Sequence, residues 1–206
     1  MKTICVYCSS SNSVETQYMD LAAELGRAMA ADGYALVFGG AKVGLMGVLA
    51  KQIKDHGGRV VGVMPELLVE KDLDYKDCDE MFVTPGMRER KAKMEELSSA
   101  FVTLPGSFGT LEELLEVITL KQLGYHRKAI VILNHDGFFD HLLAMFEHLC
   151  TLRFAKPVSR SLYHVSNTVD DALNFIRNYE EKKVEDKWLV STSHQSPRMP
   201  GWAMPL

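Results

Sequence analysis

Residues 104–113, Leu-Pro-Gly-Ser-Phe-Gly-Thr-Leu-Glu-Glu, contain the residue types that could bind an anion beside a carboxylate. The apolar run 100–104 predicts a short buried strand, Pro105 and Gly106 end it, and Thr110 could cap the helix that follows. The unpaired N–H groups and the positive dipole end of such a helix favour a phosphate. A phosphate site with a carboxylate beside it indicates nucleotide chemistry.

Thr110 and Glu113 also have a simpler interpretation, because they stand three residues apart ahead of an apolar helix. This spacing is that of a capping box, which needs no ligand. A capping glutamate uses its carboxylate on the backbone N–H of residue 110, whereas a catalytic one must be free to reach substrate. Glu112, Glu113 and Glu116 could also complement the helix dipole. The local pattern leaves these interpretations open.

A second group, Met87, Arg90, Lys91 and Met94, has the spacing i, i+3, i+4 and i+7 and therefore shares one face of a predicted helix. Two methionines beside two cations could hold a flat, partly apolar group next to an anion. The alternative is a helix whose methionines pack in the core while its charges are solvated.

The segment Gly39–Gly47 is rich in glycine and lies between a predicted strand and a predicted helix, so its backbone could approach a phosphate or a sugar closely. The alternative is a turn whose glycines allow tight packing. The segment is not a Walker A loop, since it has no Gly-Lys-Ser/Thr, and it lacks the GxGxxG spacing. Asp72 follows the next predicted strand in the mixed-charge run 70–74, where most charges are solvated.

Short apolar runs alternate with longer segments of helical period, which predicts a parallel sheet wrapped by helices. The predicted strands are Thr3–Cys8, Ala35–Phe38, Val60–Met64, Glu80–Thr84, Ala100–Leu104, Ala129–Leu133 and Ser161–Val165. The predicted helices lie at about Glu15–Ala31, Leu45–His56, Arg88–Ser98, Leu111–Leu123, Phe138–Leu152 and Val169–Tyr179. This pattern predicts a doubly wound, Rossmann-like α/β fold with helices on both faces of the sheet.

The segments that follow the predicted strands would meet at one edge of such a sheet. Ligands of open parallel sheets bind outside the carboxyl ends of the strands, near the point where the strand order reverses. The segments after the first five strands are rich in Gly, Ser, Arg, Lys and carboxylates, and they comprise residues 8–11, 39–47, 65–72, 85–91 and 105–113. Their convergence indicates a ligand site more strongly than any single motif.

Length and composition favour one domain that acts on a small soluble ligand. With 206 residues and 47% hydrophobic residues, the chain is long enough for one well-buried domain and short for two. We expect that domain to span residues 1–180, and 181–206 to be a loosely attached tail in which Trp188 and Trp202 could pin segments to the body or to a partner subunit. The net charge of −4 gives no basic field for a nucleic acid or an anionic membrane.

No apolar run approaches the roughly 20 residues of a membrane helix, and the first ten residues do not form a signal peptide, so we expect a cytoplasmic protein. The four cysteines do not form a disulfide framework. Cys5 and Cys8 spell CxxC, but within a predicted strand they face opposite sides, so we expect core thiols. The seven histidines include no HExxH and no ligand-spaced pair beside cysteines, so we expect no catalytic metal.

Taken together, three motifs resemble the LOG (Lonely Guy) family, whose members are cytokinin riboside 5′-monophosphate phosphoribohydrolases long mislabelled as lysine decarboxylases. The resemblance runs from about Lys2 to Tyr179 in order and spacing. The motifs are Gly39-Gly40 with Gly44-Leu45-Met46-Gly47, Met87-x-x-Arg90-Lys91, and Pro105-Gly106-x-x-Gly109-Thr110-x-x-Glu113.

This resemblance implies hydrolysis of the N-glycosidic bond of an adenine-type nucleoside 5′-monophosphate to the free base and ribose 5-phosphate. It implies no cofactor, and a homodimer with the active site close to the subunit boundary. Arg90 and Glu113 would be the catalytic pair. Asp72 would stand where the family usually has a substrate-binding glutamate. The other implied substrate contacts are Gly39, Gly40, Gly44, Met87, Lys91, Gly106, Ser107, Phe108, Gly109, Thr110 and Thr119.

The chain departs from the usual family motifs at a few positions, which are Ser9 in CGS, Ala41 in GGG, Arg88 in place of a frequent histidine and Ser107 in PGGxGT. A Cβ at position 107 excludes some positive-φ conformations and could crowd the phosphate, although the hydroxyl could donate a hydrogen bond. Ser107 thereby favours the alternative of a nucleotide-binding or carrier protein without turnover. A third hypothesis, amino-acid decarboxylation, normally needs a pyridoxal-phosphate lysine, and only Lys42 and Lys91 lie near the proposed edge.

Overall fold

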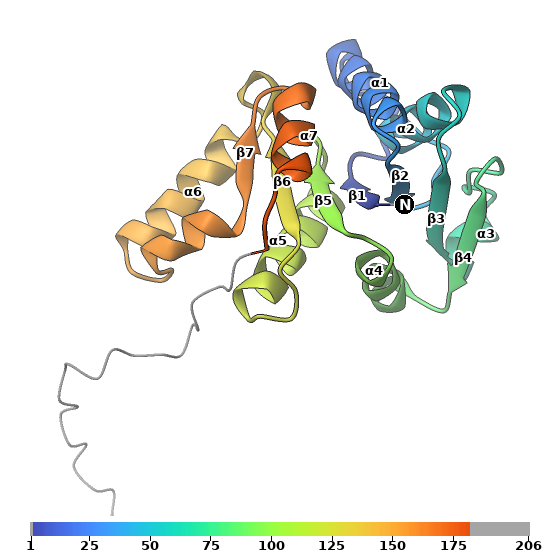
Figure 1. Ribbon diagram of the computed structural model, residues 1–206. Coiled ribbons are helices and arrows are strands. Elements are labelled where there is room, and N and C mark those ends of the chain that lie inside the picture. Colours follow the sequence, from blue (N-terminus) through green and yellow to red (C-terminus); the bar gives the residue numbers. More distant parts are fainter. Residues whose placement is uncertain (1, 182–206) are drawn as a thin grey trace, which may run out of the picture.

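Seven short strands of the described chain pair side by side, all parallel, and form the centre of the fold (Figure 1). The computed structural model describes residues 2–181. The strands are β1 Thr3–Tyr7, β2 Ala35–Phe38, β3 Val60–Pro65, β4 Glu80–Thr84, β5 Ala100–Thr103, β6 Ala129–Leu133 and β7 His164–Ser166. Their order is β4-β3-β2-β1-β5-β6-β7, so the sheet winds outward in both directions and reverses between β1 and β5.

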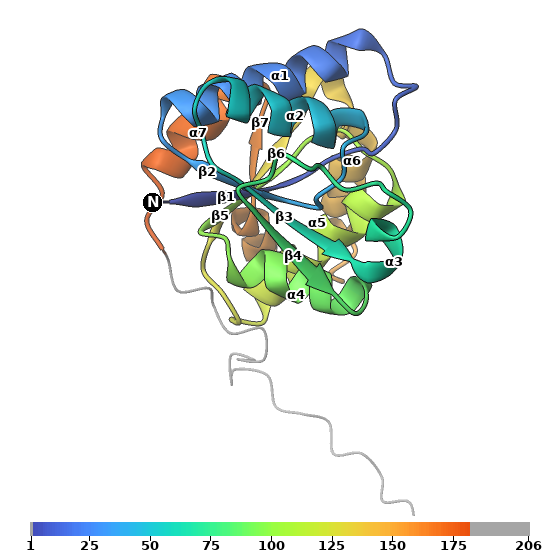
Figure 2. The same ribbon diagram turned by 90° about the vertical axis from the view of Figure 1, so that its right-hand side faces the viewer.

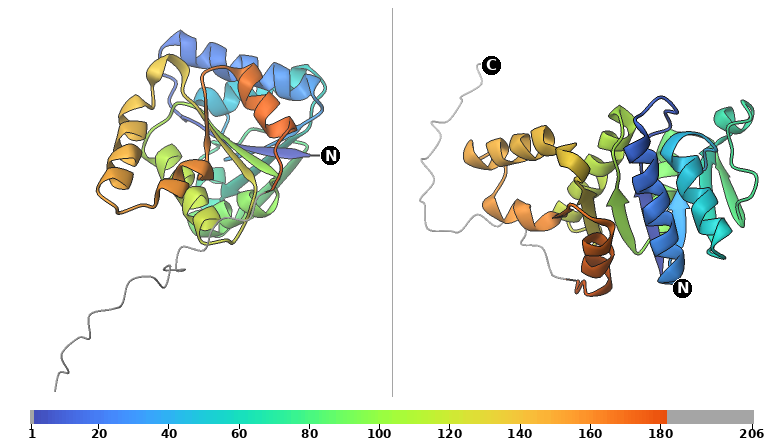
Figure 3. Two further views of the ribbon diagram at one scale, coloured as in Figure 1. Left: turned by 60° about the vertical axis from the view of Figure 1, so that its left-hand side comes forward. Right: turned by 90° about the horizontal axis from the view of Figure 1, so that it is seen from above.

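Helices cover both faces of the sheet, as the turned views show (Figures 2 and 3). One face packs against α1 (Thr16–Ala31), α2 (Gly44–Asp55) and α7 (Val169–Arg177), and the other against α4 (Met87–Glu96), α5 (Phe108–Gln122) and α6 (Asp140–Thr151). A single turn, α3 (Glu66–Val69), follows β3. The predicted doubly wound α/β fold is confirmed.

The two faces form two separate hydrophobic cores because successive strand residues point to opposite sides. Cys5 belongs to the core beneath α4 and α5, while Cys8 belongs to the core beneath α1, α2 and α7. Both are free thiols, and burial raises the pKa of each, to about 12 for Cys5. The prediction that these cysteines are core residues is confirmed.

The predicted seventh strand, Ser161–Val165, is wrong over its first half. Residues Pro157–Leu162 form a 3-10 helix, and β7 begins only at His164. Pro157 opens that helix because its fixed φ suits a first turn and its missing N–H costs no hydrogen bond there. The Ser161 hydroxyl then donates to the Val158 carbonyl oxygen over 2.7 Å.

Two further segments, α3 and a 3-10 turn at His135–Gly137, were not predicted either. From residue 182 onward, the predicted tail 181–206 lies outside the described residues. Among the helices of residues 2–181, none has the length and apolar character needed to cross a membrane.

Candidate active site

Arg90 and Glu113 face each other across the gap between α4 and α5, at the carboxyl edge of the sheet. Nη2 of Arg90 lies 3.1 Å from Oε1 of Glu113, and each residue is only 8% exposed. α4 is otherwise a polar helix, in which only Arg90 and Met94 are buried. Two residues that are 23 positions apart in the sequence therefore form one buried ion pair.

The guanidinium of Arg90 lies against the backbone of Gly39, at the end of β2. A Cβ on Gly39 would overlap Nη2 of Arg90 and would lie 3.1 Å from the sulfur of Met46. Nη1 of Arg90 donates to the sulfur of Met87 over 3.6 Å, while its Nε is buried and has no hydrogen-bond partner among the described residues. The absence of a side chain at Gly39 therefore makes room for the Arg90 guanidinium, whose Nε is left without a protein partner.

Glu113 is held in a setting that favours its neutral form. Burial raises its pKa to about 7, although the positive charge of Arg90 opposes the shift. Glu112 raises the pKa further and Lys91 lowers it, with smaller effects. A carboxyl group with a pKa near neutrality can exchange a proton at physiological pH, as acid-base catalysis requires.

The start of α5 lies beside this pair, and its first N–H groups are available. The helix begins at Phe108, with Ser107 as the N-cap, and the Ser107 side chain makes no capping hydrogen bond. In the described part of the chain, the N–H groups of Phe108, Gly109 and Thr110 have no hydrogen-bond partner. Such a helix N-terminus favours an anion.

The capping-box interpretation of Thr110 and Glu113 is wrong. Thr110 is the third residue of α5 rather than its cap, and Glu113 bonds to Arg90 instead of a backbone N–H. A Cβ on Gly106 would overlap the Thr110 hydroxyl, so Gly106 lets Thr110 fold inward, where it is buried. Gly109 faces open space, which leaves room at the helix entrance.

Ser107 adopts a conformation that any residue tolerates. Its φ is −101° and its ψ is −156°, so a Cβ at this position causes no backbone strain. Its side chain and that of Phe108 are exposed at the lip of the site. The expected conflict between Ser107 and a positive φ does not arise.

The segment Gly39–Gly47 supports the site without offering a second anion cradle. Gly44 has a φ of +60°, and a Cβ there would lie 2.6 Å from the Ser9 carbonyl oxygen. The Gly44 N–H donates to Oδ1 of Asn12 over 2.7 Å, and the Leu45 N–H donates to the Ser9 carbonyl oxygen over 3.0 Å. Protein groups therefore already occupy the first donors of α2, in contrast to those of α5.

Asp72 lies beside this segment but is engaged with lysines. Its carboxylate is 2.7 Å from Nζ of Lys42 and 3.2 Å from Nζ of Lys76, and its φ is +54°. The hydrogen bond from Lys42, followed by that from Lys76, lowers its pKa. Gly40, with a φ of +79°, accepts a hydrogen bond from the Tyr75 N–H, which ties the two segments together.

Two other predicted contacts, Lys91 and Thr119, are not part of the ion pair. Lys91 bridges α4 to α5 by pairing with Glu112 and, over 3.0 Å, with Glu116. Thr119 lies six residues after Glu113 on α5, and its hydroxyl donates to the Leu115 carbonyl oxygen. The chain therefore does not bring Thr119 to its own Arg90–Glu113 pair.

Met46 and Asn12 support the site, although sequence reasoning gave them no role of their own. The sulfur of Met46 lies on the same side of Gly39 as the Arg90 guanidinium, and Asn12 binds the start of α2. Met46 stands inside a motif that was already noted, whereas nothing marks Asn12 in the sequence. Within residues 2–181, no cluster of three His, Cys, Asp or Glu side chains could hold a metal ion.

Comparisons with known proteins match this chain over most of its length. A family model described as "Possible lysine decarboxylase" matches residues 46–176. Cytokinin riboside 5′-monophosphate phosphoribohydrolase LOG of Oryza sativa subsp. japonica is 44% identical over 178 residues, covering 86% of this chain and 74% of the rice protein. Its relative LOG3 of Arabidopsis thaliana is 36% identical, with 86% of this chain and 83% of LOG3 covered.

A solved structure with this fold comes from a carrier protein. The molybdenum cofactor carrier protein of Chlamydomonas reinhardtii superposes with a TM-score of 0.65 at 22% identity, covering 85% of this chain and 95% of the carrier. At this identity the likeness concerns the fold alone.

The contact between Gly39 and Arg90 leads to a first prediction, which concerns the stability of a Gly39→Ala variant. Gly39→Ala places a methyl group on the guanidinium, so we expect the variant to lose about 1–3 kcal/mol of unfolding free energy. Gly109→Ala is the control, since Gly109 faces open space within a helix and alanine there is neutral or mildly stabilising. Denaturant unfolding measures both, and a Gly39→Ala variant as stable as the parent would contradict the described contact.

The raised pKa of Glu113 leads to a second prediction, which concerns how the free energy of unfolding depends on pH. The neutral form is stabilised in the folded state, so this contribution is complete below pH 4.5 and is lost as the pH rises to about 7. Glu113→Gln cannot ionise, so we expect its stability relative to the parent to rise over this window by up to about 3 kcal/mol. Unfolding curves between pH 4.5 and 8 measure the difference, and a constant offset would refute the shift.

Proposed function

The chain belongs to the LOG family of cytokinin riboside 5′-monophosphate phosphoribohydrolases, and we propose that it hydrolyses the N-glycosidic bond of adenine-type nucleoside 5′-monophosphates. The products are the free base and ribose 5-phosphate. The observation that carries this proposal is the buried Arg90–Glu113 pair beside a helix N-terminus with free donors. A carboxyl group and an anion cradle at the point where the strand order reverses suit a phosphorylated sugar.

The start of α5 binds the 5′-phosphate in this proposal. The N–H groups of Phe108, Gly109 and Thr110 and the positive end of the helix dipole favour the anion, and the exposed Ser107 hydroxyl adds a donor. Gly109 leaves the entrance open for the phosphate oxygens. The phosphate then fixes the ribose against Glu113 and Arg90.

Glu113 and Arg90 act on the bond between C1′ of the ribose and the base. As this bond breaks, its electron pair leaves with the base nitrogen, and positive charge develops on the ribose. The Glu113 carboxylate stabilises that charge and orients the water whose oxygen forms the new bond to C1′. The proton released by the water can pass to Glu113, whose pKa is about 7, and the departing base takes up a proton from Glu113 or from solvent, which restores the carboxylate.

Arg90 positions the substrate and maintains the charge of its partner. Its guanidinium is permanently charged and presents several N–H donors, so it can donate to a ribose hydroxyl or a phosphate oxygen. Its positive charge also opposes the effect of burial on Glu113 and so maintains a population of the carboxylate at neutral pH. Lys91 acts less directly, by neutralising Glu112 and Glu116 beside the phosphate.

Other functions receive less support. A carrier needs no buried carboxyl group with a pKa near 7, and Ser107, the residue that favoured a carrier, adopts an ordinary conformation. For decarboxylation, a lysine must be free to form a Schiff base. Lys42 pairs with Asp72, and Lys91 pairs with two glutamates.

We propose further that the protein is a cytoplasmic homodimer. Leu115 and Thr119 on α5 and Leu123 at its C-cap follow one another at four-residue spacing, and both leucines are 42% exposed. Met145 on α6 and Tyr125 after α5 add exposed apolar surface. If a second copy of the chain packs on this face, Thr119 of one subunit could lie near the active site of the other. The free thiols at all four cysteines support a reducing compartment.

The reaction is tested with AMP, isopentenyladenosine monophosphate and the corresponding nucleosides, with assay of the free base. We expect release from the monophosphates and little from the nucleosides, because only the former bind at α5. Equal rates on both would remove the role of the helix N-terminus. Tight AMP binding without base release over hours would instead establish a carrier.

The role of Glu113 is tested by Glu113→Gln, which keeps the shape and removes the negative charge. We expect kcat to fall about 10²–10³-fold, the size of effect seen when one electrostatic contact to a transition state is lost. Glu96→Gln is the control, since it removes an exposed carboxylate of α4 that pairs with Lys93. A Glu113→Gln variant at the parent rate would end this assignment.

The pKa of Glu113 also predicts the pH dependence of the reaction. Because the carboxylate is the active form, we expect kcat/KM to rise with pH through about 7 and then to level off. Initial rates between pH 5 and 9 measure this profile. A rate that falls as the pH passes 7 would show that the protonated acid is the active form.

A further inference from the structure

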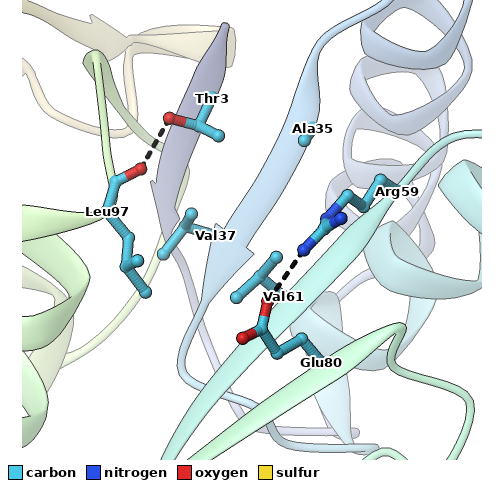
Figure 4. Close-up of a pocket in the computed structure, with 7 residues that line it drawn as sticks. All are labelled: Thr3, Ala35, Val37, Arg59, Val61, Glu80 and Leu97. Carbon is cyan, nitrogen blue, oxygen red and sulfur yellow. Dashed lines mark hydrogen bonds and ion pairs between the residues drawn. The ribbon is translucent and has the colours of Figure 1, made fainter. Parts of the chain in front are cut away.

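A cavity of about 320 Å³ opens at the amino-terminal ends of the strands β1 to β4, at the opposite edge of the sheet from Arg90 and Glu113 (Figure 4). α4 packs on this face of the sheet and ends at Leu97, so the cavity lies between the end of the helix and the first residues of the strands. The proposed reaction does not use it. Its volume is at the lower end of the range for small-molecule sites, which suits one ring system rather than a whole nucleotide.

The floor of the cavity and one of its walls are apolar. Ala35 and Val37 of β2 point to the same face because they stand two residues apart, and Val61 of β3 pairs with Val37 in register. Leu97 forms the wall and is fixed there, because its carbonyl oxygen accepts a hydrogen bond from the Thr3 hydroxyl over 2.7 Å. A planar ring in the cavity would therefore have aliphatic side chains against one face and one edge.

The opposite wall is polar. Nη2 of Arg59 lies 2.7 Å from Oε2 of Glu80, and Figure 4 shows this ion pair across the floor from Leu97. The two side chains are 50% and 44% exposed, so a ligand can reach the groups that the ion pair leaves over. Those groups are the other N–H donors of the guanidinium and the second carboxylate oxygen, which make no further hydrogen bond within residues 2–181. The wall thus offers a donor beside an acceptor.

The charges around the cavity favour a neutral ligand over an anion. Leu97 is the C-cap of α4, and the carboxyl end of a helix carries partial negative charge. The charges of Arg59 and Glu80 offset each other across their short contact. This edge therefore lacks the positive field that favours a phosphate at the start of α5.

We propose that this cavity binds a free aminopurine base, of which adenine is the probe. The purine ring packs on Val37 and Val61, and the amino group of adenine stands beside a ring nitrogen, so that a donor and an acceptor share one edge. The amino group donates to the Glu80 carboxylate, and an N–H of Arg59 donates to the ring nitrogen. This inference does not depend on the proposed reaction, because it rests on the cavity alone.

Calorimetric titration of the full chain with adenine and with purine tests this proposal. Purine keeps the ring system but lacks the amino group that donates to Glu80. We expect saturable binding of adenine, and binding of purine that is about tenfold weaker, the effect of losing one hydrogen bond to a charged group. Adenine that does not bind at millimolar concentration, or purine that binds as tightly as adenine, would overturn the proposal.

Arg59→Met locates the bound base, because it removes the donors of the polar wall at an exposed position. We expect adenine to bind about tenfold more weakly to this variant. Arg160→Met is the matched control, since Arg160 forms a similarly exposed ion pair with Glu147 away from the cavity, and it should bind adenine as the parent does. Adenine binding that is unchanged in Arg59→Met would overturn the proposal.

Glu113→Gln separates this cavity from the catalytic pair. The change lies at the opposite edge of the sheet, so adenine should bind to this variant with the parent affinity. Loss of binding in Glu113→Gln together with its retention in Arg59→Met would place the base at the catalytic pair and overturn the proposal. Binding is measured without turnover, so failure to release base from AMP would contradict the proposed function and leave this result unaffected.

Discussion

The burial of two opposite charges, Arg90 and Glu113, is the constraint on which the rest of the site depends. Removing two ions from water costs several kcal/mol each, and their mutual attraction offsets this cost only where the geometry is good. Here a single contact of 3.1 Å joins them, and Glu113, with a pKa of about 7, is about half ionised at neutral pH. The protein thus maintains a carboxyl group that can change protonation state at working pH, at the expense of stability above that pH.

Two glycines beside this ion pair are explained by the side chains that pack against them. Gly39 has no side chain because the guanidinium occupies its place, and Gly106 has none because Thr110 folds inward to complete the turn into α5. The two helices that begin near the reversal of strand order differ in consequence. Asn12 and Ser9 satisfy the first donors of α2, while those of α5 have no protein partner in the described chain. The start of α2 is therefore bonded to protein groups, whereas the start of α5 can bind an anion beside Glu113.

The fold could be predicted from the sequence because five strands, β1, β2, β3, β5 and β6, are almost wholly buried and read as continuous apolar runs. The meeting of Arg90 and Glu113 followed from the motifs, and their catalytic roles stay predictions. The start of α5 could not be predicted, since Thr110 and Glu113 fit a capping box until Arg90, distant in sequence, is placed. Local pattern also could not show that Lys42 binds Asp72 or that Pro157 opens a 3-10 helix, because those depend on neighbours in space and on proline geometry.

A double-mutant cycle between Arg90→Lys and Glu113→Gln tests the central claim most directly, that these two residues act as one buried unit on the substrate. The quantity to measure is kcat/KM for a nucleoside 5′-monophosphate in the parent, both single variants and the double variant. The account predicts strong coupling, with the double variant about as slow as the slower single variant, because either change already removes the pair. Effects that simply multiply would show that Arg90 and Glu113 act independently, and would contradict it.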